Sequence, residues 1–421
     1  MMRKYRIGIL GMGTVGQGFI NNYHLNKEEI DYKIGGELDF VNVLVRNTVK
    51  KRDVNLDKKV YTNQFDNINL KELDVVVELI GGVSSAFEYI KKALENGCHV
   101  VTANKELMAK KGIELIKTAR ENEVLIRYEA SVGGGIPIIS TLNDSLSSNK
   151  IERLMGILNG TTNYILTKMT KEKMSFKDVL KEAQELGFAE ADPTSDVNGS
   201  DAAYKLAILS KDAFGIIVNP EDISREGIRN ISLEDIEYGQ ELGYKIKLLA
   251  LGEKSNEHVE LSVQPALIPV EHPIASVNYE FNALFIEGNV VGEIMLYGKG
   301  AGSMPTGSAV LTDVIDITRK KNDYIGTCSA KDIVVNNIGR SAYYVRMEVV
   351  DLPGVLGKIA VSFGEQGVSL DSVVQRARGG KHAPLVFITH EIDRATLNAV
   401  LESIQKNNYV LEVMSIIRVV N

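Results

Sequence analysis

A glycine-rich segment near the start of the chain constrains the fold more than any other feature. Its sequence is Gly11-Met12-Gly13-Thr14-Val15-Gly16, and it lies between an apolar run at residues 7–10 and an amphipathic stretch that begins at Val15. In a strand, glycine turn and helix of this kind, the first glycine permits a tight turn, the second lets the backbone approach a pyrophosphate, and the third lets the helix pack on the strand. The helix N-terminus adds amide donors and a dipole that favours anions. We predict a dinucleotide site here; the alternative is a glycine turn without a ligand. The residues expected to contact the dinucleotide are Gly11, Gly13, Thr14, Val15 and Gly16.

Strand and helix patterns alternate after this segment. We expect strands at residues 41–45, 74–80, 99–102 and 124–128, and helices at residues 84–96 and 104–122. This alternation predicts an α/β fold with a doubly wound parallel sheet of the Rossmann type over residues 1–140. Because 421 residues are too many for one hydrophobic core, we expect two further domains at residues 141–328 and 341–421.

Composition excludes several classes of protein. The net charge of −7, with no long Lys/Arg block, argues against a nucleic-acid partner. The two cysteines, Cys98 and Cys328, are too few for a disulfide framework and fit a reducing compartment, so we expect a cytoplasmic protein. Residues 1–6 do not read as a signal peptide, and no apolar run approaches the roughly 20 residues of a membrane helix.

Arg46 stands at the end of the second expected strand, where a site selective for NAD usually places an acidic residue that binds the ribose 2′-hydroxyl. Lys50, Lys51 and Arg52 follow it. Such cations suit the 2′-phosphate of NADP through charge-assisted hydrogen bonds. We therefore expect NADP as the cofactor, with NAD as the alternative; without a ligand, the segment is a solvated basic loop.

Two further segments of the first domain are candidates for chemistry. Thr102-Ala103-Asn104-Lys105 follows an expected strand, at the edge where doubly wound sheets bind ligands, so Lys105 either faces the reacting groups or is an ordinary lysine at a helix start. Gly133-Gly134-Gly135 lies within residues 129–137. Three glycines permit dihedrals that aim carbonyl oxygens at a hard cation or a ligand, or they form a flexible linker.

The densest charged cluster lies in the middle of the chain. Glu190, Asp192, Asp196 and Asp201 occur within a loop broken by glycine and proline, and a helix is expected to run from Asp201 past Lys205. Asp201 and Lys205 are four residues apart and share one helix face, either as a surface ion pair or as part of a site. Carboxylates beside a lysine suit the binding of a substrate ammonium group and proton transfer to a substrate oxygen. Residues 159–163 form a second polar segment at a strand end.

Taken together, these motifs resemble those of homoserine dehydrogenase over nearly the whole chain. The most specific stretch is residues 183–205, which carries the family pattern of Ala, Gly, Asp-Pro, Asp, Gly, Asp and Lys. Residues 101–105, 129–137, 158–164 and 301–310 resemble further family motifs in the same order. Met12 stands where leucine is commoner and Gly307 where alanine is more usual, and these departures affect cofactor fit rather than chemistry.

The resemblance implies reversible NAD(P)H-dependent reduction of L-aspartate 4-semialdehyde to L-homoserine, a step toward threonine and methionine. It also implies a central α+β catalytic and dimerisation domain, in a homodimer or homotetramer. At matching positions, Lys205 would be the acid–base residue and Lys105 a second candidate. Glu190, Asp201 and Gly187 would bind the amino acid. The cofactor would contact Thr102, Lys105, Gly187, Glu190 and Gly302. Main-chain oxygens of Glu129, Val132, Gly134 and Ile136 would bind a structural sodium ion. We expect Asp201 to contact the substrate rather than Lys205, because a direct ion pair would raise the lysine pKa.

The last 80 residues alternate as strand, helix, strand, strand, helix and strand, at residues 343–350, 355–366, 369–376, 385–392, 395–407 and 410–419. This βαββαβ pattern resembles an ACT domain, a small amino-acid-sensing module. In the family, it implies a threonine effector held near residues 351–356; the alternative is a domain that only stabilises a dimer.

Two other functions compete with this one. A semialdehyde dehydrogenase that forms a thioester needs a nucleophilic cysteine beside a base, and neither Cys98 nor Cys328 lies near a candidate base in the sequence. A non-catalytic sensor of NADP and an amino acid would not need both lysines and all four carboxylates.

Overall fold

The computed structural model describes residues 3–255, 258–319, 334–336, 339–376 and 381–420, so Cys328 lies outside the described residues. The chain forms two compact units, each assembled from three segments. The first unit comprises Met1–Glu152, Tyr204–Asp222 and Asn282–Lys331, and the second comprises Arg153–Ala203, Ile223–Phe281 and Asp332–Asn421. The predicted domain limits, 1–140, 141–328 and 341–421, stay a prediction.

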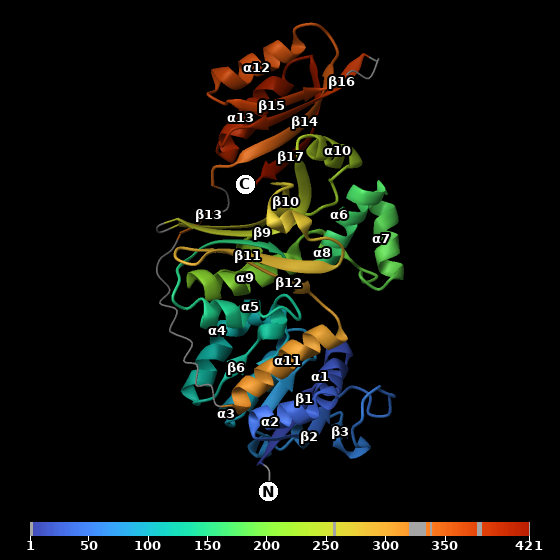
Figure 1. Cartoon of the computed structure of the whole chain (residues 1–421), viewed down its shortest axis with the longest axis vertical. Helices are drawn as coiled ribbons and strands as arrows, with labels where there is room; N and C mark the ends of the chain where they lie inside the picture. The colour runs from blue at the N-terminus through green and yellow to red at the C-terminus, as the bar shows by residue number, and fades with distance from the viewer. Residues whose placement is uncertain (1–2, 256–257, 320–333, 337–338, 377–380, 421) are drawn as a thin grey trace. The chain divides into compact units, whose positions relative to one another are not determined.

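The first unit contains a six-stranded parallel sheet with the order β3-β2-β1-β4-β5-β6 (Figure 1). From β1 the chain proceeds outward to β2 and β3, and then returns to β4 on the other side of β1. This order confirms the doubly wound sheet. The strands are β1 (Arg3–Leu10), β2 (Gly36–Leu44), β3 (Tyr61–Thr62), β4 (Val75–Glu78), β5 (His99–Thr102) and β6 (Ile126–Arg127). The helices that alternate with them are α1 (Thr14–Leu25), α2 (Lys27–Ile34), α3 (Ser84–Glu95) and α4 (Lys105–Glu121).

The first unit is completed by later segments of the chain. They are η4 (Glu129–Ser131), α5 (Ile138–Ser140), η5 (Thr141–Ser145), most of α9 (Ser200–Phe214) from Tyr204 on, β11 (Phe281–Gly288) from Asn282 on, β12 (Gly292–Lys299) and α11 (Ser303–Thr318). Helix α11 lies along α1 in Figure 1, and its Val310 and Val314 share a hydrophobic core with Ile7 of β1 and Phe19 of α1. The apolar face of α11 therefore closes the core of a sheet that begins about 300 residues earlier in the sequence.

Two glycines make the contact between α1 and α11 close. A Cβ atom on Gly18 would collide with the carbonyl group of Ser303, and a Cβ on Gly307 would lie 2.5 Å from the backbone of Gly18. Ser303 Oγ also donates to Thr14 O (2.8 Å), and Asn22 Nδ2 donates to Met304 O (2.8 Å). Gly307, which departs from the family pattern, thus has a packing role in this chain.

The second unit contains the strand order β7-β9-β10-β17-β14-β16-β15. The strands are β7 (Ile151–Ile157), β9 (Tyr244–Ser255), β10 (His258–Pro269), β14 (Ala342–Val350), β15 (Leu370–Gln375), β16 (His382–Thr389) and β17 (Val410–Val419), with β8 (Ser224–Arg225) and β13 (Val334–Asn336) also paired to β10. The helices are α6 (Gly160–Glu172), α7 (Phe176–Glu185), α8 (Thr194–Val197), α10 (Leu233–Glu241), α12 (Val355–Glu365) and α13 (Arg394–Gln405).

The C-terminal part of this unit runs β14, α12, β15, β16, α13 and β17, which confirms the predicted βαββαβ order. Its core includes Phe363, Phe387 and Leu397, all fully buried. Strand β17 pairs in parallel with β10 through Ala266 and Leu267, so the C-terminal sheet continues the sheet of β7, β9 and β10.

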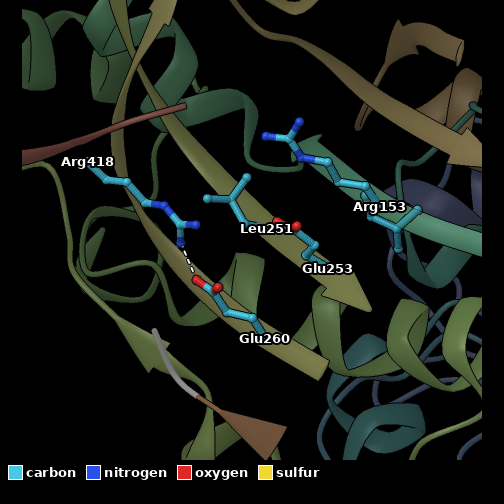
Figure 2. Close-up of a pocket in the computed structure, with 7 residues that line it drawn as sticks. Arg153, Leu251, Glu253, Glu260 and Arg418 are labelled. Carbon is cyan, nitrogen blue, oxygen red and sulfur yellow. Dashed lines mark hydrogen bonds and ion pairs between the residues drawn. The ribbon is translucent and has the colours of Figure 1, made fainter. Parts of the chain in front are cut away.

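Two buried ion pairs join these parts of the second unit. Arg346 of β14 donates to the fully buried Asp235 of α10 (2.7 Å). Burial raises the pKa of Asp235, but hydrogen bonds from Arg346, Ser415 and Ser232 outweigh it and hold that pKa below its usual range. Figure 2 shows the second pair, in which Arg418 of β17 contacts Glu260 of β10. Loss of one partner from such a pair leaves an uncompensated charge in the protein interior.

Among the described residues, no helix is long and apolar enough to cross a membrane.

The close contact between α1 and α11 predicts an inverted response to a helix-favouring substitution. In an exposed helix, Gly→Ala stabilises by about 0.5–1 kcal/mol. Gly18→Ala should instead destabilise the protein by about 1–3 kcal/mol, because the new methyl group must displace the backbone at Ser303. Thermal unfolding of Gly18→Ala and of a control variant measures both changes in stability. Gly357→Ala is the matched control, since no heavy atom of the described residues lies within 4 Å of its Cβ position in α12. A Gly18→Ala variant as stable as Gly357→Ala would contradict the packing.

Candidate active site

The three glycines of the first turn have distinct environments. Gly11 has φ +104°, and a Cβ there would lie 2.5 Å from Leu79 O. A Cβ on Gly16 would lie 2.7 Å from Gly11 O, so this glycine lets α1 pack on the turn. Within the described part of the chain, no heavy atom lies within 4 Å of a Cβ on Gly13. Gly13 therefore faces open space, as a position approached by a ligand should, and the residues present fit a bound dinucleotide.

Helix α1 begins immediately after this open position. Gly13 is its N-cap residue, and no side chain among the described residues caps the helix. The amide groups of the first turn, which includes Thr14 and Val15, therefore remain available to an anion. This end of the helix has the chemistry that a pyrophosphate requires.

The basic loop after β2 is held against the glycine turn by Arg52 rather than by Arg46. Arg52 donates to Asn47 O (2.9 Å), Lys50 O (2.9 Å) and Met12 O (3.4 Å), and its guanidinium lies over the Tyr61 ring. The loop is also fastened to α1, because Asp53 N donates to Gln17 Oε1 (2.8 Å). Arg46 is exposed in the same loop. Hydrogen bonds thus hold this loop beside the glycine turn.

Lys105 is the first residue of α4 and is exposed. Its helix is capped by Asn104, whose Oδ1 accepts from Leu107 N (3.1 Å) and whose Nδ2 donates to Gly82 O (2.6 Å). Thr102 is fully buried, and its hydroxyl donates to Glu78 Oε2 (2.6 Å) and accepts from Asn104 N (3.0 Å). The start of α4, and with it Lys105, is therefore fixed by the ends of β4 and β5.

Lys205 lies on α9 and is 8% exposed. Helix α9 packs beside α4 in the first unit, where Lys110 lies over the Tyr204 ring at 5.2 Å and Met108, Ala207 and Ile208 line one small pocket. The two candidate lysines are thus carried by neighbouring helices. One of them is buried and the other is exposed.

Asn159 joins two of the four carboxylates that the sequence singles out. It is buried at the N-cap of α6, where Oδ1 accepts from Thr162 N (2.9 Å). Its Nδ2 donates to Asp196 Oδ1 (2.7 Å) and to Asp201 Oδ2 (2.9 Å). Asp201 is 2% exposed and lies one helical turn before Lys205 on α9. A single amide therefore fixes both aspartates.

The other two carboxylates have separate environments. Asp192 is exposed and accepts from Thr194 N (3.1 Å). Hydrogen bonding to the side chain and the amide of Thr194 holds the pKa of Asp192 below its usual range. Glu190 is exposed, and its main-chain oxygen accepts from Gln184 Nε2 (3.1 Å). Gly187 follows the end of α7 with φ +77°, the left-handed conformation common after a helix C-terminus. This backbone conformation favours glycine at position 187, apart from the contacts predicted for it.

The glycine run after β6 has a packing role. Gly133 and Gly134 have φ values of +71° and +57°. A Cβ on Gly134 would collide with Gly300, and a Cβ on Gly135 would lie 2.9 Å from Pro305, so the run lets the backbone of the 299–305 segment approach. Gly302, in that segment, has φ +119° and is the N-cap residue of α11. These contacts place residues 133–135 against the first turn of α11.

Two buried carboxylates lie at the same loop, Glu129 of the loop itself and Asp313 of α11. Glu129, Val132, Gly134 and Ile136 are all buried. The Glu129 carboxylate accepts from Ile139 N and Ser140 N (2.8 Å each), while its own N–H donates to Asp313 Oδ2 of α11 (2.9 Å). Burial, followed by repulsion from Glu129, raises the pKa of Asp313 well above its usual value. No group of three or more His, Cys, Asp or Glu side chains in the described residues could hold a metal ion.

Cys98 does not meet the requirements of a thioester-forming nucleophile. It is fully buried, and its Sγ donates to Leu70 O (3.1 Å). Burial raises the pKa of this thiol to about 11, so the thiolate is scarce at neutral pH.

Models of known families match nearly all of the chain. A model of the homoserine dehydrogenase NAD-binding domain matches residues 11–129, a homoserine dehydrogenase model matches residues 137–315, and an ACT domain model matches residues 343–408. A homoserine dehydrogenase from Bacillus subtilis is 43% identical over 99% of both chains. The chain belongs to the homoserine dehydrogenase family. It is therefore an oxidoreductase with an NAD(P)-binding domain and a C-terminal ACT domain.

Solved structures of homoserine dehydrogenases agree with this assignment. One from Thiobacillus denitrificans has a TM-score of 0.92 and 39% identity, over 100% of this chain and 99% of that one. A hyperthermophilic archaeal homoserine dehydrogenase in complex with NADPH has a TM-score of 0.63 and 30% identity, over 75% of this chain and 98% of that one.

The sequence did not single out three residues that organise the site. Asn159 was predicted only as part of a polar segment, although Asn before a helix and after a strand is a recognisable capping signal. Arg52 was predicted only as support for Arg46. Glu78 was not predicted at all, although a carboxylate that ends the apolar run Val75–Val77 is unusual enough to find it.

The role of Asn159 predicts a selective loss of activity in Asn159→Ser. Serine is also a good N-cap, so α6 should keep its start, but the amide donor to Asp196 and Asp201 is lost. Because a hydrogen bond to a charged group contributes about 1.5–3 kcal/mol, kcat/KM for homoserine should fall about 10- to 100-fold, with thermal stability changed little. Steady-state kinetics and thermal unfolding measure the two effects. Ser175→Asn, an exchange at the exposed N-cap of α7, is the control. An Asn159→Ser enzyme with full kcat/KM would contradict this role.

Proposed function

We propose that the chain reduces L-aspartate 4-semialdehyde to L-homoserine reversibly, with Lys205 as the residue that gives and takes the proton on the substrate oxygen. The observation that carries this assignment is a nearly buried lysine one turn after an aspartate that Asn159 holds in place. When bound, the nicotinamide of the cofactor supplies the hydride to the aldehyde carbon. The ammonium group of Lys205 stabilises and protonates the alkoxide that develops, and in the reverse direction its amine accepts the hydroxyl proton.

Glu190 and Asp201 bind the ammonium group of the amino acid in this proposal, with Gly187 beside them. The family resemblance at residues 183–205 supports the assignment, as does the fixed orientation of Asp201. Asp201 then pairs with the substrate rather than with Lys205, so that it does not hold the lysine proton too firmly. Lys105, at the start of α4, is the second candidate for contact with the reacting oxygen.

NADP is the proposed cofactor. The open position at Gly13 and the first turn of α1, with Gly11, Thr14, Val15 and Gly16, suit the pyrophosphate. Arg46 suits the 2′-phosphate, and Arg52 holds the loop that carries it. Thr102, Lys105, Gly187, Glu190 and Gly302 complete the proposed contacts. NAD remains the alternative, as a cofactor without the 2′-phosphate.

A structural sodium ion is proposed at the main-chain oxygens of Glu129, Val132, Gly134 and Ile136. Their fit rests on the left-handed dihedrals at Gly133 and Gly134, which turn successive peptide groups in a buried loop. Carbonyl oxygens are the donors that a hard cation prefers. A bound sodium ion would stabilise the loop.

Threonine is proposed as the effector of the ACT domain, near residues 351–356, in a cytoplasmic homodimer or homotetramer. Support for regulation comes from the sheet that joins β17 to β10 and from the Arg346–Asp235 ion pair. Support for assembly comes from β12, a strand at the end of its sheet, whose Ile294, Met295 and Leu296 are half-buried and whose Tyr297 is exposed.

Replacement of Lys205 tests the proposed chemistry. General acid–base catalysis contributes about 10²–10⁴-fold, so Lys205→Ala should lower kcat by at least about 100-fold while the enzyme still binds NADPH. NADPH oxidation with aspartate semialdehyde gives kcat, and NADPH fluorescence gives binding. Lys117→Ala, at an exposed position on α4, is the control. Near-normal turnover by Lys205→Ala would end the assignment.

The same assay on the wild-type enzyme tests the proposed effector and ion. It is repeated with threonine, and with choline in place of sodium, and unchanged rates would contradict both proposals. Sedimentation of the same protein as a monomer would contradict the proposed assembly.

The two arginines should affect the two cofactors differently. Arg46→Ala should raise KM for NADPH about 10-fold and leave KM for NADH unchanged, because only NADPH has the 2′-phosphate and a lost charge-assisted hydrogen bond is worth about 1.4 kcal/mol or more. Arg52→Ala should raise KM for both cofactors, since Arg52 also contacts the glycine turn at Met12 O. Steady-state kinetics with each cofactor measure the four values, with the exposed Lys58→Ala as the control. Equal effects of Arg46→Ala on NADPH and NADH would contradict the assignment.

A further inference from the structure

Glu78 is a buried carboxylate that the proposed chemistry does not use. It is the last residue of β4 and is 0% exposed. Its Oε1 accepts from Ile80 N (2.8 Å) and Gly81 N (3.2 Å), and its Oε2 accepts from the Thr102 hydroxyl (2.6 Å). A carboxylate is rarely placed in the interior without such partners, because its desolvation is costly. Glu78 is therefore a buried carboxylate, stabilised by hydrogen bonds, at the end of an otherwise apolar strand.

The partners of Glu78 lie on the exit loops of two adjacent strands. Ile80 and Gly81 follow β4, whereas Thr102 ends β5. Asn104 closes the same arrangement, because its Nδ2 donates to Gly82 O (2.6 Å) in the loop after β4. One side chain thus sets the relative position of both loops.

The loop after β4 also contacts the glycine turn. Leu79 N donates to Leu10 O (2.7 Å), and Gly11 lies so close to Leu79 O that a Cβ would not fit. The order of the sheet reverses between the paired strands β1 and β4. Ligands of doubly wound sheets bind at such a point, at the carboxyl ends of the strands. Glu78 therefore lies where the exit loops of β1, β4 and β5 meet.

The direction of the hydrogen bonds requires an acceptor at Glu78. The Thr102 hydroxyl oxygen accepts from Asn104 N (3.0 Å), so its proton is directed to Glu78 Oε2. Each of these three hydrogen bonds brings a proton to the carboxylate, from two amides and one hydroxyl. An amide in place of the carboxylate would present its NH₂ group to one of these donors. Burial raises the pKa of Glu78, and the hydrogen bonds from Thr102, Ile80 and Gly81 oppose this rise.

We propose that Glu78 is a positioning residue for the reduction: it holds the exit loops of β4 and β5 so that α4 starts with Lys105 at the edge of the sheet that receives the nicotinamide. The chain from the carboxylate to the lysine is short, since Thr102 is bonded to Glu78, Asn104 is bonded to Thr102 and to the loop after β4, and Lys105 follows Asn104. This inference rests on the proposed function. It adds a residue that contacts neither substrate nor cofactor but governs groups that do. A misplacement of about 1 Å in such groups is sufficient to lower a rate about 100-fold.

Glu78→Gln tests the proposal in the full-length enzyme. We expect kcat for homoserine oxidation to fall about 10- to 100-fold, with KM for homoserine changed less than threefold, because the reacting groups shift while the carboxylates that bind the amino acid do not. The matched control is Glu72→Gln, at a half-exposed residue of the segment before β4 that pairs with Arg6 on the surface. It should match the wild type.

A measurement without cofactor or substrate separates this proposal from the proposed function. In the cofactor-free enzyme, hydrogen exchange of the Ile80 and Gly81 amides should be at least tenfold faster in Glu78→Gln than in the wild type or Glu72→Gln. Thr102→Val is the second variant, in case Glu78→Gln does not fold, and it should lower kcat in the same direction. The double variant should be less impaired than the product of the single effects, because both changes disrupt one network.

Three results would overturn the proposal: unchanged exchange at Ile80 and Gly81, faster exchange with full kcat, or independent effects of the two substitutions. If the wild type lacks homoserine oxidation yet exchange responds as expected, the failure belongs to the proposed function and not to the network around Glu78.

Discussion

Helix α11 is the element on which the rest of the first unit depends, and its contact with α1 is possible only because glycine occupies both sides. Gly18 and Gly307 let the two backbones approach, and Ser303 and Asn22 complete the contact with hydrogen bonds. At the same time Asp313 of α11 binds the main chain of Glu129. One helix from late in the sequence therefore closes the core beside the glycine turn and fixes the loop of Gly133–Gly135. The segment before it, with Gly302, is positioned by the same contacts. The dinucleotide part of the molecule is thus not a contiguous N-terminal stretch, because residues before 153 are completed by residues 204–222 and 282–331.

The sequence predicted the elements with strong periodicity and missed those fixed by tertiary contacts. β5 at His99–Thr102 and β17 at Val410–Val419 have the predicted bounds, because both are apolar and end at clear polar or turn residues. The start of helix α11 at Ser303 carries no such pattern, since its first turn is small and polar and is held by α1 instead of by an apolar face. Helix α2, Lys27–Ile34, was not predicted because its residues are mostly charged. No local pattern reports that α11 packs on α1, because that information lies in the fit of two glycines far apart in the chain.

The candidate site divides in the same way. The roles of Gly11, Gly13 and Gly16 were predicted from local context, and in the structure Gly11 and Gly16 are closely packed while Gly13 faces open space. The family motif located Lys205, Asp201 and Glu190, but the residues that orient such groups did not stand out. Glu78, Arg52 and Asn159 act through hydrogen bonds to partners that are 24, 40 and 42 residues away, respectively. Spacing rules detect neighbours on one helix or strand, and they do not detect a side chain that connects two loops. Buried polar residues at strand ends are therefore the best guide to what motif reading leaves out.

We propose that Lys205 exchanges the proton on the substrate oxygen while Glu190 and Asp201 bind the amino group. A crystal structure of the enzyme with NADP⁺ and L-homoserine tests it most directly, because it places every atom of the substrate against the proposed residues. We expect Lys205 Nζ to lie within hydrogen-bond distance of the homoserine hydroxyl, about 2.6–3.2 Å, and the ammonium group to contact the two carboxylates. A hydroxyl group that contacts a different proton donor, with Lys205 paired to Asp201 instead, would contradict it.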